Sequence, residues 1–377
     1  MTKDTRINTL NIGLMIFSMV AAFVMPFEVF LFAYAFMGPL HYLTEISWLH
    51  DKKYFTKGKY DYLVLLIIGI IITFEYFAYK THFWPFDTED HRAMASNWNL
   101  GDKLLFLALF GAIIMAFVKN VPMKILSLLL IFFISNGVFA KTDDESGYSN
   151  GLYILTAFVP TLIHVYVFTG LFMLYGALKS RSKSGIWSVV VFVLCPILLI
   201  ALFKDQTGIH VSSYGAKAYG GPTSSDGFFD LNQGILARFF NPATIAQHIP
   251  GVDLAKNSEN EIWNALVYKS QTGILLMRFI AFAYMYHYLN WFSKTEIIRW
   301  HKVPKIRFVV VIILWIASLA IYALDYAKGL QWLFFLSFCH VLLEFPLNAV
   351  SFAGIFKETK TIAKSGFKPA MQTAAKS

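Results

Sequence analysis

Long apolar segments constrain this chain more than any other feature of its sequence. About 20 mostly apolar residues cross the hydrocarbon core of a bilayer as one helix, and ten segments of the chain come near to or exceed that length. They cover residues 8–26, 27–49, 60–79, 102–118, 123–140, 151–178, 184–203, 268–292, 306–325 and 329–356. The pattern predicts an all-α, polytopic transmembrane helical bundle with about ten spans.

The overall composition favours a membrane protein over a soluble one. Hydrophobic residues make up 57% of the chain and charged residues 15%, whereas soluble domains carry about 25% charged residues. Both cysteines, Cys195 and Cys339, lie within apolar runs, which favours packed thiols over a redox pair. The net charge of +9 does not indicate a nucleic-acid partner, because the basic residues are spread among the connections between apolar segments.

The charges of those connections predict the orientation of the bundle. Lys and Arg collect in alternate connections, such as 50–59 and 293–307, and in the C-terminal tail, whereas 87–90 and 143–145 are acidic. Positive connections face the cytoplasm. Both termini are then cytoplasmic if the chain turns at Met25, while one kinked helix there would give nine spans and opposite termini. We expect an integral protein of a bacterial cytoplasmic membrane.

The positions of the apolar segments predict one transmembrane domain followed by a short tail. Residues 1–356 are expected to form one transmembrane domain, and residues 357–377 a basic cytoplasmic tail. The long connection at 204–262 lies on the outer side in this topology, and loops of more than about 15 residues are often functional. We therefore predict that it forms a lid, with short interfacial helices at Ile235–Phe240 and Ile245–Ile249.

Four histidines lie inside the predicted spans, where an ionisable side chain is costly unless it is paired, ligated or hydrated. They are His41, His164, His287 and His340. The predicted depths of His41, His164 and His340 agree within about one helical turn, at a rise of about 1.5 Å per residue. Imidazoles at one depth on separate helices can converge on one point, so all four are predicted metal ligands.

Two of these histidines are followed, four residues later, by Glu45 and Glu344. That spacing puts each pair on one face of a helix. In a dry interior the carboxylate either ligates a cation or holds the imidazole in the tautomer that ligates. Glu45 and Glu344 are therefore predicted metal ligands or catalytic groups. Arg278, also within a span, is a candidate substrate anchor.

Imidazole and carboxylate ligands suit iron, zinc or manganese. The depth of the histidines favours non-haem iron over zinc, because hydrolysis by zinc needs a route for water; two of the imidazoles could instead bind haem. Three other interpretations stay open. The His and Glu pairs could be internal hydrogen bonds of the bundle, a proton relay of a transporter, or packing in a structural subunit of a membrane complex.

Three short motifs resemble one enzyme family. Residues 38–45, Gly-Pro-Leu-His-Tyr-Leu-Thr-Glu, resemble the Gly-x-x-His-x-x-x-Asp element of the Brp/Blh β-carotene 15,15′-dioxygenases. Residues 161–164, Thr-Leu-Ile-His, resemble that family's second histidine helix, and residues 338–340 its segment of Phe, Cys and His. This chain is longer, has Glu for Asp and lacks a His-x-x-x-His element. The resemblance implies a multi-helix membrane oxygenase with iron held by histidines on separate helices.

The leading hypothesis is an integral membrane metalloenzyme, a non-haem iron oxygenase that acts on a carotenoid, lipid or isoprenoid. Its expected partners are membrane lipids and a hydrophobic small-molecule substrate that enters between the helices. The competing hypotheses are an ion-coupled or proton-coupled transporter that uses the same His and Glu pairs, and a structural subunit.

Overall fold

The structure, a computed structural model, describes residues 3–81, 100–139, 150–203, 209, 211–222, 228–294, 299 and 302–367. Every regular element in these ranges is a helix, which confirms the predicted all-α class. In chain order the elements are α1 (Lys3–Val24), α2 (Pro26–Phe32), the π-helix η1 (Ala33–Met37), α3 (Gly38–Asp51), the 3₁₀ turn η2 (Lys53–Phe55), α4 (Asp61–Thr81), α6 (Leu100–Phe117), α7 (Val121–Phe139), α8 (Asn150–Tyr153), the π-helix η3 (Ile154–Phe168), α9 (Thr169–Ser180), α10 (Lys183–Phe203), α11 (Ser213–Tyr219), α12 (Phe229–Phe239), α13 (Pro242–Ala246), α14 (Glu259–Tyr268), α15 (Gln271–Ser293), α17 (Lys305–Leu324) and α18 (Tyr326–Ser365).

Eight helical stretches are long and apolar enough to cross a membrane. They are α1, the run from α2 to α3, α6, α7, the run from α8 to α9, α10, α17 and α18. The two remaining predicted segments coincide with α4 and α15. α15 has the length of a span at 23 residues, but polar side chains such as Arg278, His287 and Asn290 make it less apolar. The described residues thus support a polytopic membrane protein, and the count of ten spans stays a prediction.

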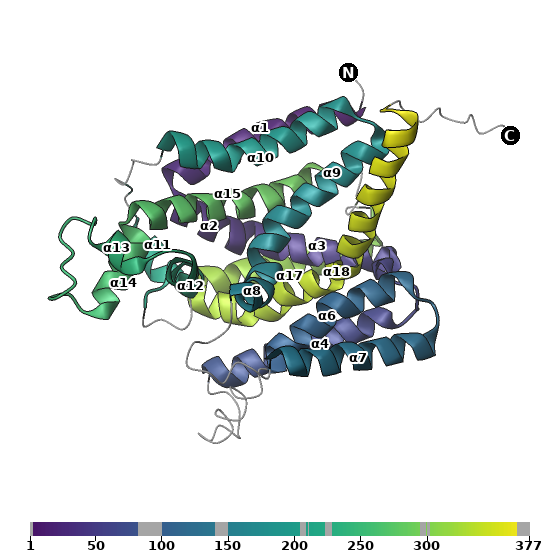
Figure 1. Ribbon diagram of the computed structural model, residues 1–377, viewed down its shortest axis with the longest axis horizontal. Helices are drawn as coiled ribbons and strands as arrows, with labels where there is room; N and C mark the ends of the chain where they lie inside the picture. Colours follow the sequence, from purple (N-terminus) through teal and green to yellow (C-terminus); the bar gives the residue numbers. More distant parts are fainter. Residues whose placement is uncertain are drawn as a thin grey trace.

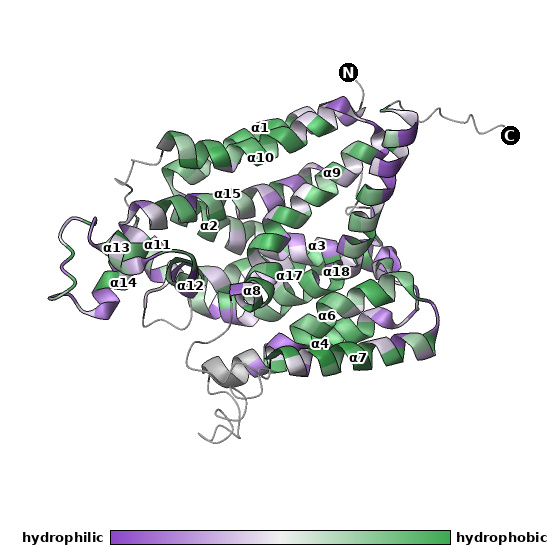
Figure 2. Cartoon of the chain, in the orientation of Figure 1, coloured by the Kyte–Doolittle hydropathy of each residue, from purple (hydrophilic) through white to green (hydrophobic). Residues whose placement is uncertain are grey.

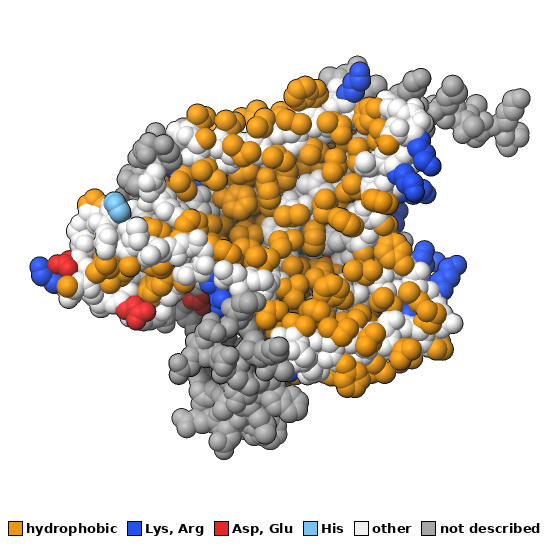
Figure 3. Space-filling view, viewed as in Figure 1, with side chains coloured by type: hydrophobic (Ala, Val, Ile, Leu, Met, Phe, Trp, Pro, Cys, Tyr) orange, Lys and Arg blue, Asp and Glu red, His pale blue; other side chains and the backbone are white. Residues whose placement is uncertain are grey.

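The surface of the bundle is apolar across its middle. Figure 2 shows hydrophobic residues along most of the long helices, and Figure 3 shows apolar side chains across this face. Leu126 and Phe133 of α7 are 69% and 70% exposed, which suits a helix that faces lipid. Lys and Arg gather at the end where α1 begins and α18 finishes (Figures 1 and 3). That this end faces the cytoplasm stays a prediction, because the acidic connections at 87–90 and 143–145 lie outside the described residues.

The first two predicted spans separate at the expected turn. α1 ends at Val24, and Met25 leaves helical geometry with φ −139° and ψ 67°. Pro26 occupies the first turn of α2, where a missing backbone N–H removes no helical hydrogen bond. The chain folds back here into a second helix, as Figure 1 shows, and does not continue as one kinked helix.

Two helices form the scaffold of the interior. α15 packs against α1, α2, α10 and η3, and every residue from Ile280 to Tyr288 is buried. α18 packs against α3, α4, α6, α9 and α17. α18 is a single helix of 40 residues that runs past the predicted end of the last span, at residue 356, as far as Ser365. Part of the predicted basic tail is therefore helical, and residues 368–377 lie outside the description.

Two π-helical segments interrupt the α-helices that carry histidines. The π-helix η1 directly precedes Gly38, and the π-helix η3 contains both Pro160 and His164. Pro160 has no N–H to donate, and its ring clashes with the preceding turn of an α-helix. A wider turn with i→i+5 hydrogen bonds relieves this conflict, and such turns occur frequently at functional sites.

The predicted lid at 204–262 contains helices in its described part. They are α11, α12, α13 and the beginning of α14. α12 begins at Phe229 and not at Ile235 as predicted, and α13 spans Pro242–Ala246 and not Ile245–Ile249. The side chain of Asn241 accepts a hydrogen bond from the Thr244 amide, which makes α13 begin at Pro242, and the extended backbone of Phe240 ends α12 at Phe239. Phe229, Ile235 and Leu236 are buried against the bundle, so this part of the segment packs on the helices.

Candidate metal centre

The four predicted histidines meet inside the bundle. His41 comes from α3, His164 from η3, His287 from α15 and His340 from α18. One ring nitrogen of each lies within 4.8 Å of such an atom in each of the others. The side chains are 1%, 2%, 7% and 2% exposed, respectively. The predicted convergence is confirmed.

Several nitrogen atoms of this cluster lack a hydrogen-bond partner. His41 Nδ1, both ring nitrogens of His164 and His340 Nε2 are buried without one. The one close contact inside the cluster joins His287 Nε2 to His41 Nε2, at 3.0 Å. Buried polar atoms in proteins are nearly always paired. Imidazoles that face one another with free lone pairs fit a bound cation, so the residues present suit a metal ion.

A threonine fixes the orientation of one ligand. Thr169 Oγ1 lies 2.7 Å from His287 Nδ1, on the far side of the ring from the cluster. A hydroxyl that accepts the Nδ1 proton leaves the Nε2 lone pair of His287 directed at the other histidines. Thr169 was not predicted, because only the packing of α9 and η3 beside α15 brings it there.

The two glutamates join the cluster, but not both as predicted. Glu45 Oε2 lies 3.0 Å from His41 Nε2, which confirms the pairing within α3. Glu344 Oε2 instead lies 3.5 Å from Nδ1 of His164 on η3, and no such contact with His340 of its own helix is formed. The reason is that η3 packs on α18 and presents an unpaired nitrogen to this carboxyl group. Both glutamates are buried, at 3% and 1% exposure.

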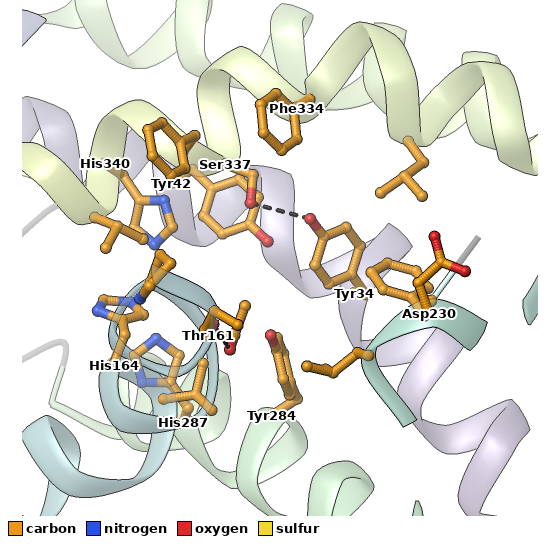
Figure 4. A pocket seen from close by; sticks show the side chains of 18 of the residues that line it. Tyr34, Tyr42, Thr161, His164, Asp230, Tyr284, His287, Phe334, Ser337 and His340 are labelled. Atoms are coloured by element: carbon orange, nitrogen blue, oxygen red, sulfur yellow. Dashed lines mark hydrogen bonds between the residues drawn. The ribbon is translucent and has the colours of Figure 1, made fainter. Parts of the chain in front are cut away.

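A cavity of about 490 Å³ extends from the histidines toward the beginning of α12. Figure 4 shows His164, His287 and His340 at one end of it and Asp230 of α12 at the other. Its walls are mainly aromatic and aliphatic. The tyrosine hydroxyls in the wall are partly paired with one another or with serine, at 2.8 Å for Tyr42 and Tyr288 and 3.0 Å for Tyr34 and Ser337.

The segment at 204–262, which is the predicted lid, contributes residues to the wall of this cavity. Phe228, just before α12, and Asp230 and Leu231 within its first turn line the cavity. Part of the segment at 204–262 therefore belongs to the cavity wall, and its role as a lid stays a prediction. Tyr42 stacks on the ring of His340, with centroids 4.2 Å apart. Tyr42 and Tyr288 each directly follow a ligand histidine in the sequence, a signal that could have identified them.

Arg278 lies away from this cavity. Its Nε donates to the carbonyl oxygen of Phe23 at 3.2 Å, and its guanidinium lies 4.3 Å from the centre of the Phe23 ring. These contacts stabilise the last turn of α1, where carbonyl groups lack helical partners. The predicted role of Arg278 as a substrate anchor receives no support from its position and stays a prediction.

The fold and the site define a helical membrane protein with a buried centre of four histidines that can bind a metal ion. No protein-family model, no curated protein and no solved structure matches the chain. The resemblance of its motifs to the Brp/Blh dioxygenases therefore stays untested by these comparisons.

Proposed function

We propose that this protein is an integral membrane metalloenzyme, a non-haem iron oxygenase that acts on a lipophilic substrate. One observation carries the proposal. Ring nitrogens from four helices converge at the end of an aromatic cavity within the membrane-spanning bundle, and those of His164 and His340 include buried atoms without a hydrogen-bond partner. A purely structural cluster would be expected to pair these atoms within the protein.

The ligand types support iron as the metal. Imidazole with nearby carboxylate suits iron, zinc and manganese, and the absence of thiolate or thioether from the described cluster disfavours copper(I). Bound iron supplies the activation of dioxygen that oxidation of an unactivated C–H or C=C bond requires. The histidines hold the ion, Thr169 orients His287, and Glu45 and Glu344 orient or ligate beside His41 and His164.

The cavity supports a lipophilic substrate. Tyr284, Phe334 and Phe338 line it together with aliphatic side chains, and such a wall excludes water from the reacting atoms. An elongated molecule that entered from the lipid or beneath α12 would place one part next to the histidines. Carotenoids, lipids and isoprenoids have this character. The resemblance of residues 38–45 to the Brp/Blh enzymes makes a polyene the first substrate to test.

Metal analysis of the detergent-purified protein tests the proposal. We expect stoichiometric iron in the wild type after anaerobic reconstitution, and loss of iron in His164→Ala and His340→Ala. His248→Ala is the matched control, because this exposed histidine bonds the Thr244 carbonyl outside the centre. Oxygen consumption with carotenoid or isoprenoid in mixed micelles should follow iron content. A wild type that holds no metal after reconstitution would contradict the proposal.

A proton-coupled or ion-coupled transporter is the second candidate. The observation that favours it is the interruption of two helices by π-helical segments beside His41 and His164, because transporters often bind their ions at broken helices. Proteoliposomes with an imposed pH gradient separate the two candidates. Flux that depends on His164 in metal-free protein would favour transport over oxygenation.

A further inference from the structure

Beside the histidines lies a second group of buried polar atoms, formed by Glu45 of α3 and by Glu344 and Asn348 of α18. We propose that this group binds a second divalent metal ion, so that the centre is dinuclear. The inference rests on the proposed function, since it extends the histidine site that would hold the first ion.

Two carboxyl groups lie against each other in the membrane interior. Glu45 and Glu344 come from different helices, and their carboxyl groups lie close enough to interact directly. In the described part of the chain their charged contacts are with histidines, and neither forms an ion pair with Lys or Arg. Two ionised carboxylates at this separation repel each other strongly in a medium of low dielectric constant. A cation bound between them removes this repulsion.

The same group also has unused ligand atoms. Glu45 Oε2 and Glu344 Oε1 have no hydrogen-bond partner. Asn348 lies one helical turn beyond Glu344 and beside its carboxyl group, and is 8% exposed. Neither the amide oxygen nor the amide nitrogen of Asn348 has a hydrogen-bond partner. Carboxylate and amide oxygens are ligands that hard divalent cations prefer.

The distances to the histidines are those of ligands that share a metal ion. With metal–ligand bonds of about 2.1 Å, neighbouring ligands in an octahedral site lie about 3 Å apart. Glu45 Oε2 is 3.0 Å from His41 Nε2, and Glu344 Oε2 is 3.5 Å from His164 Nδ1. Glu344 thus has one oxygen next to a histidine of the first site and a second oxygen free for another ion. This is the arrangement of a carboxylate that bridges two metal ions.

A dinuclear centre accounts for every member of the polar group. With one metal ion at the four histidines, Glu344 Oε1 and the Asn348 amide would stay without a partner. A second ion uses both carboxylates and the amide together. Two ions about 3.5–4 Å apart can also position and polarise two oxygen atoms at once, which suits a reaction of dioxygen.

Iron stoichiometry tests this inference. Protein stripped with a chelator is loaded with Fe(II) under argon, desalted and analysed for iron per chain. We expect two iron ions in the wild type, and one in Glu45→Gln, in Glu344→Gln and in Asn348→Leu. Glu28→Gln should keep two, because that carboxylate bonds the Ser212 amide far from the histidines and also has an unpaired buried oxygen.

The outcomes separate this inference from the proposed function. One iron ion in the wild type would overturn the second site and leave the histidine site intact, whereas none would overturn both. Two ions in the wild type and in all three variants would overturn the assignment to these residues. If a variant does not fold, the wild type loaded with Mn(II) still decides. Exchange coupling between two ions in its electron paramagnetic resonance spectrum is expected, and the spectrum of an isolated ion would contradict the proposal.

Discussion

Two neighbouring residues of α15, Tyr286 and His287, belong to two different polar clusters. The clusters differ in how far their hydrogen bonds are satisfied. On one side of α15, Tyr286 donates to Asn11 Oδ1 at 3.0 Å, and Ser293 donates to the same atom at 3.1 Å. Asn11 in turn donates to the Ile7 carbonyl at 2.9 Å. On the other side, His287 faces His164 and His340, whose ring nitrogens include buried atoms without a hydrogen-bond partner. The first cluster is complete within the protein, and the second is not.

The difference distinguishes a structural polar cluster from a binding site. Burying a polar group costs about 1–3 kcal/mol when its hydrogen bonds are not replaced. The Asn11 cluster, defined by Asn11, Tyr286, Asn290 and Ser293, avoids that cost and ties α1 to α15. The histidine cluster bears the cost in the metal-free protein, and a bound ion would remove it. Mutations should therefore change stability in the first cluster and metal affinity in the second.

The largest effect is expected from His340→Leu. Loss of a ligand should lower metal affinity more than the loss of an orienting group does, which is about 10-fold to 100-fold. The metal-free protein should be as stable as the wild type or more stable, because Leu replaces a ring with an unpaired nitrogen. Metal titration and the denaturation midpoint in detergent measure both. Strong destabilisation with unchanged metal affinity would make this cluster structural.

Thr169→Val sharpens the comparison without removing a ligand. The substitution keeps the shape of the side chain and removes the hydroxyl that lies 2.7 Å from His287 Nδ1. Metal affinity should fall about 10-fold to 100-fold, as for other groups that orient ligand histidines. Thr73→Val is the control, since that buried hydroxyl bonds the Gly69 carbonyl on α4, outside the centre. Equal metal affinities in the two variants would exclude an orienting role for Thr169.

Asn11→Leu addresses the complete cluster. It leaves the hydroxyls of Tyr286 and Ser293 without their shared acceptor, which should reduce the free energy of unfolding by about 1–3 kcal/mol. Metal affinity should not change. The test compares denaturation midpoints and metal content of the same preparations, and a loss of metal in Asn11→Leu would show that the two clusters are coupled through α15.

Tyr286→Phe should have the smallest effect. It removes one hydroxyl and leaves Asn11 able to accept from Ser293, so we expect a loss of about 0.5–1.5 kcal/mol in unfolding free energy. Tyr288→Phe is its counterpart on the cavity side of the same helix, where it breaks the bond to Tyr42. Only the Tyr288 variant should change substrate binding in the loaded protein. An equal change of substrate binding in the Tyr286 and Tyr288 variants would contradict the distinction between the two sides of α15.

The helical class and the convergence of the histidines could be predicted from the sequence because both depend only on distances counted along the chain. Apolar length gives the helices, and counting residues from the helix ends gives depth. Depth was enough for His41, His164 and His340, which needed only to lie at one level. Asn348 follows Glu344 by four residues, so the same helical spacing also places it on the face of α18 that carries Glu344.

Contacts across helices could not be predicted in this way. Glu344 pairs with His164 because η3 is π-helical and packs on α18, and neither fact follows from spacing on one helix. Arg278 bonds a carbonyl 255 residues away in the sequence, at the end of α1. A charge inside a span predicts that some partner exists, and does not predict which one.

The four histidines lie on four separate elements, and this affects when the protein can bind its ion during synthesis. Of the four elements that carry the histidines, α3 is synthesised first and α18 last. No part of the chain that ends before α18 holds all four histidines, so an insertion intermediate that lacks α18 cannot capture the ion with full affinity. Metal uptake with full affinity therefore reports that α18 has docked against the other three elements.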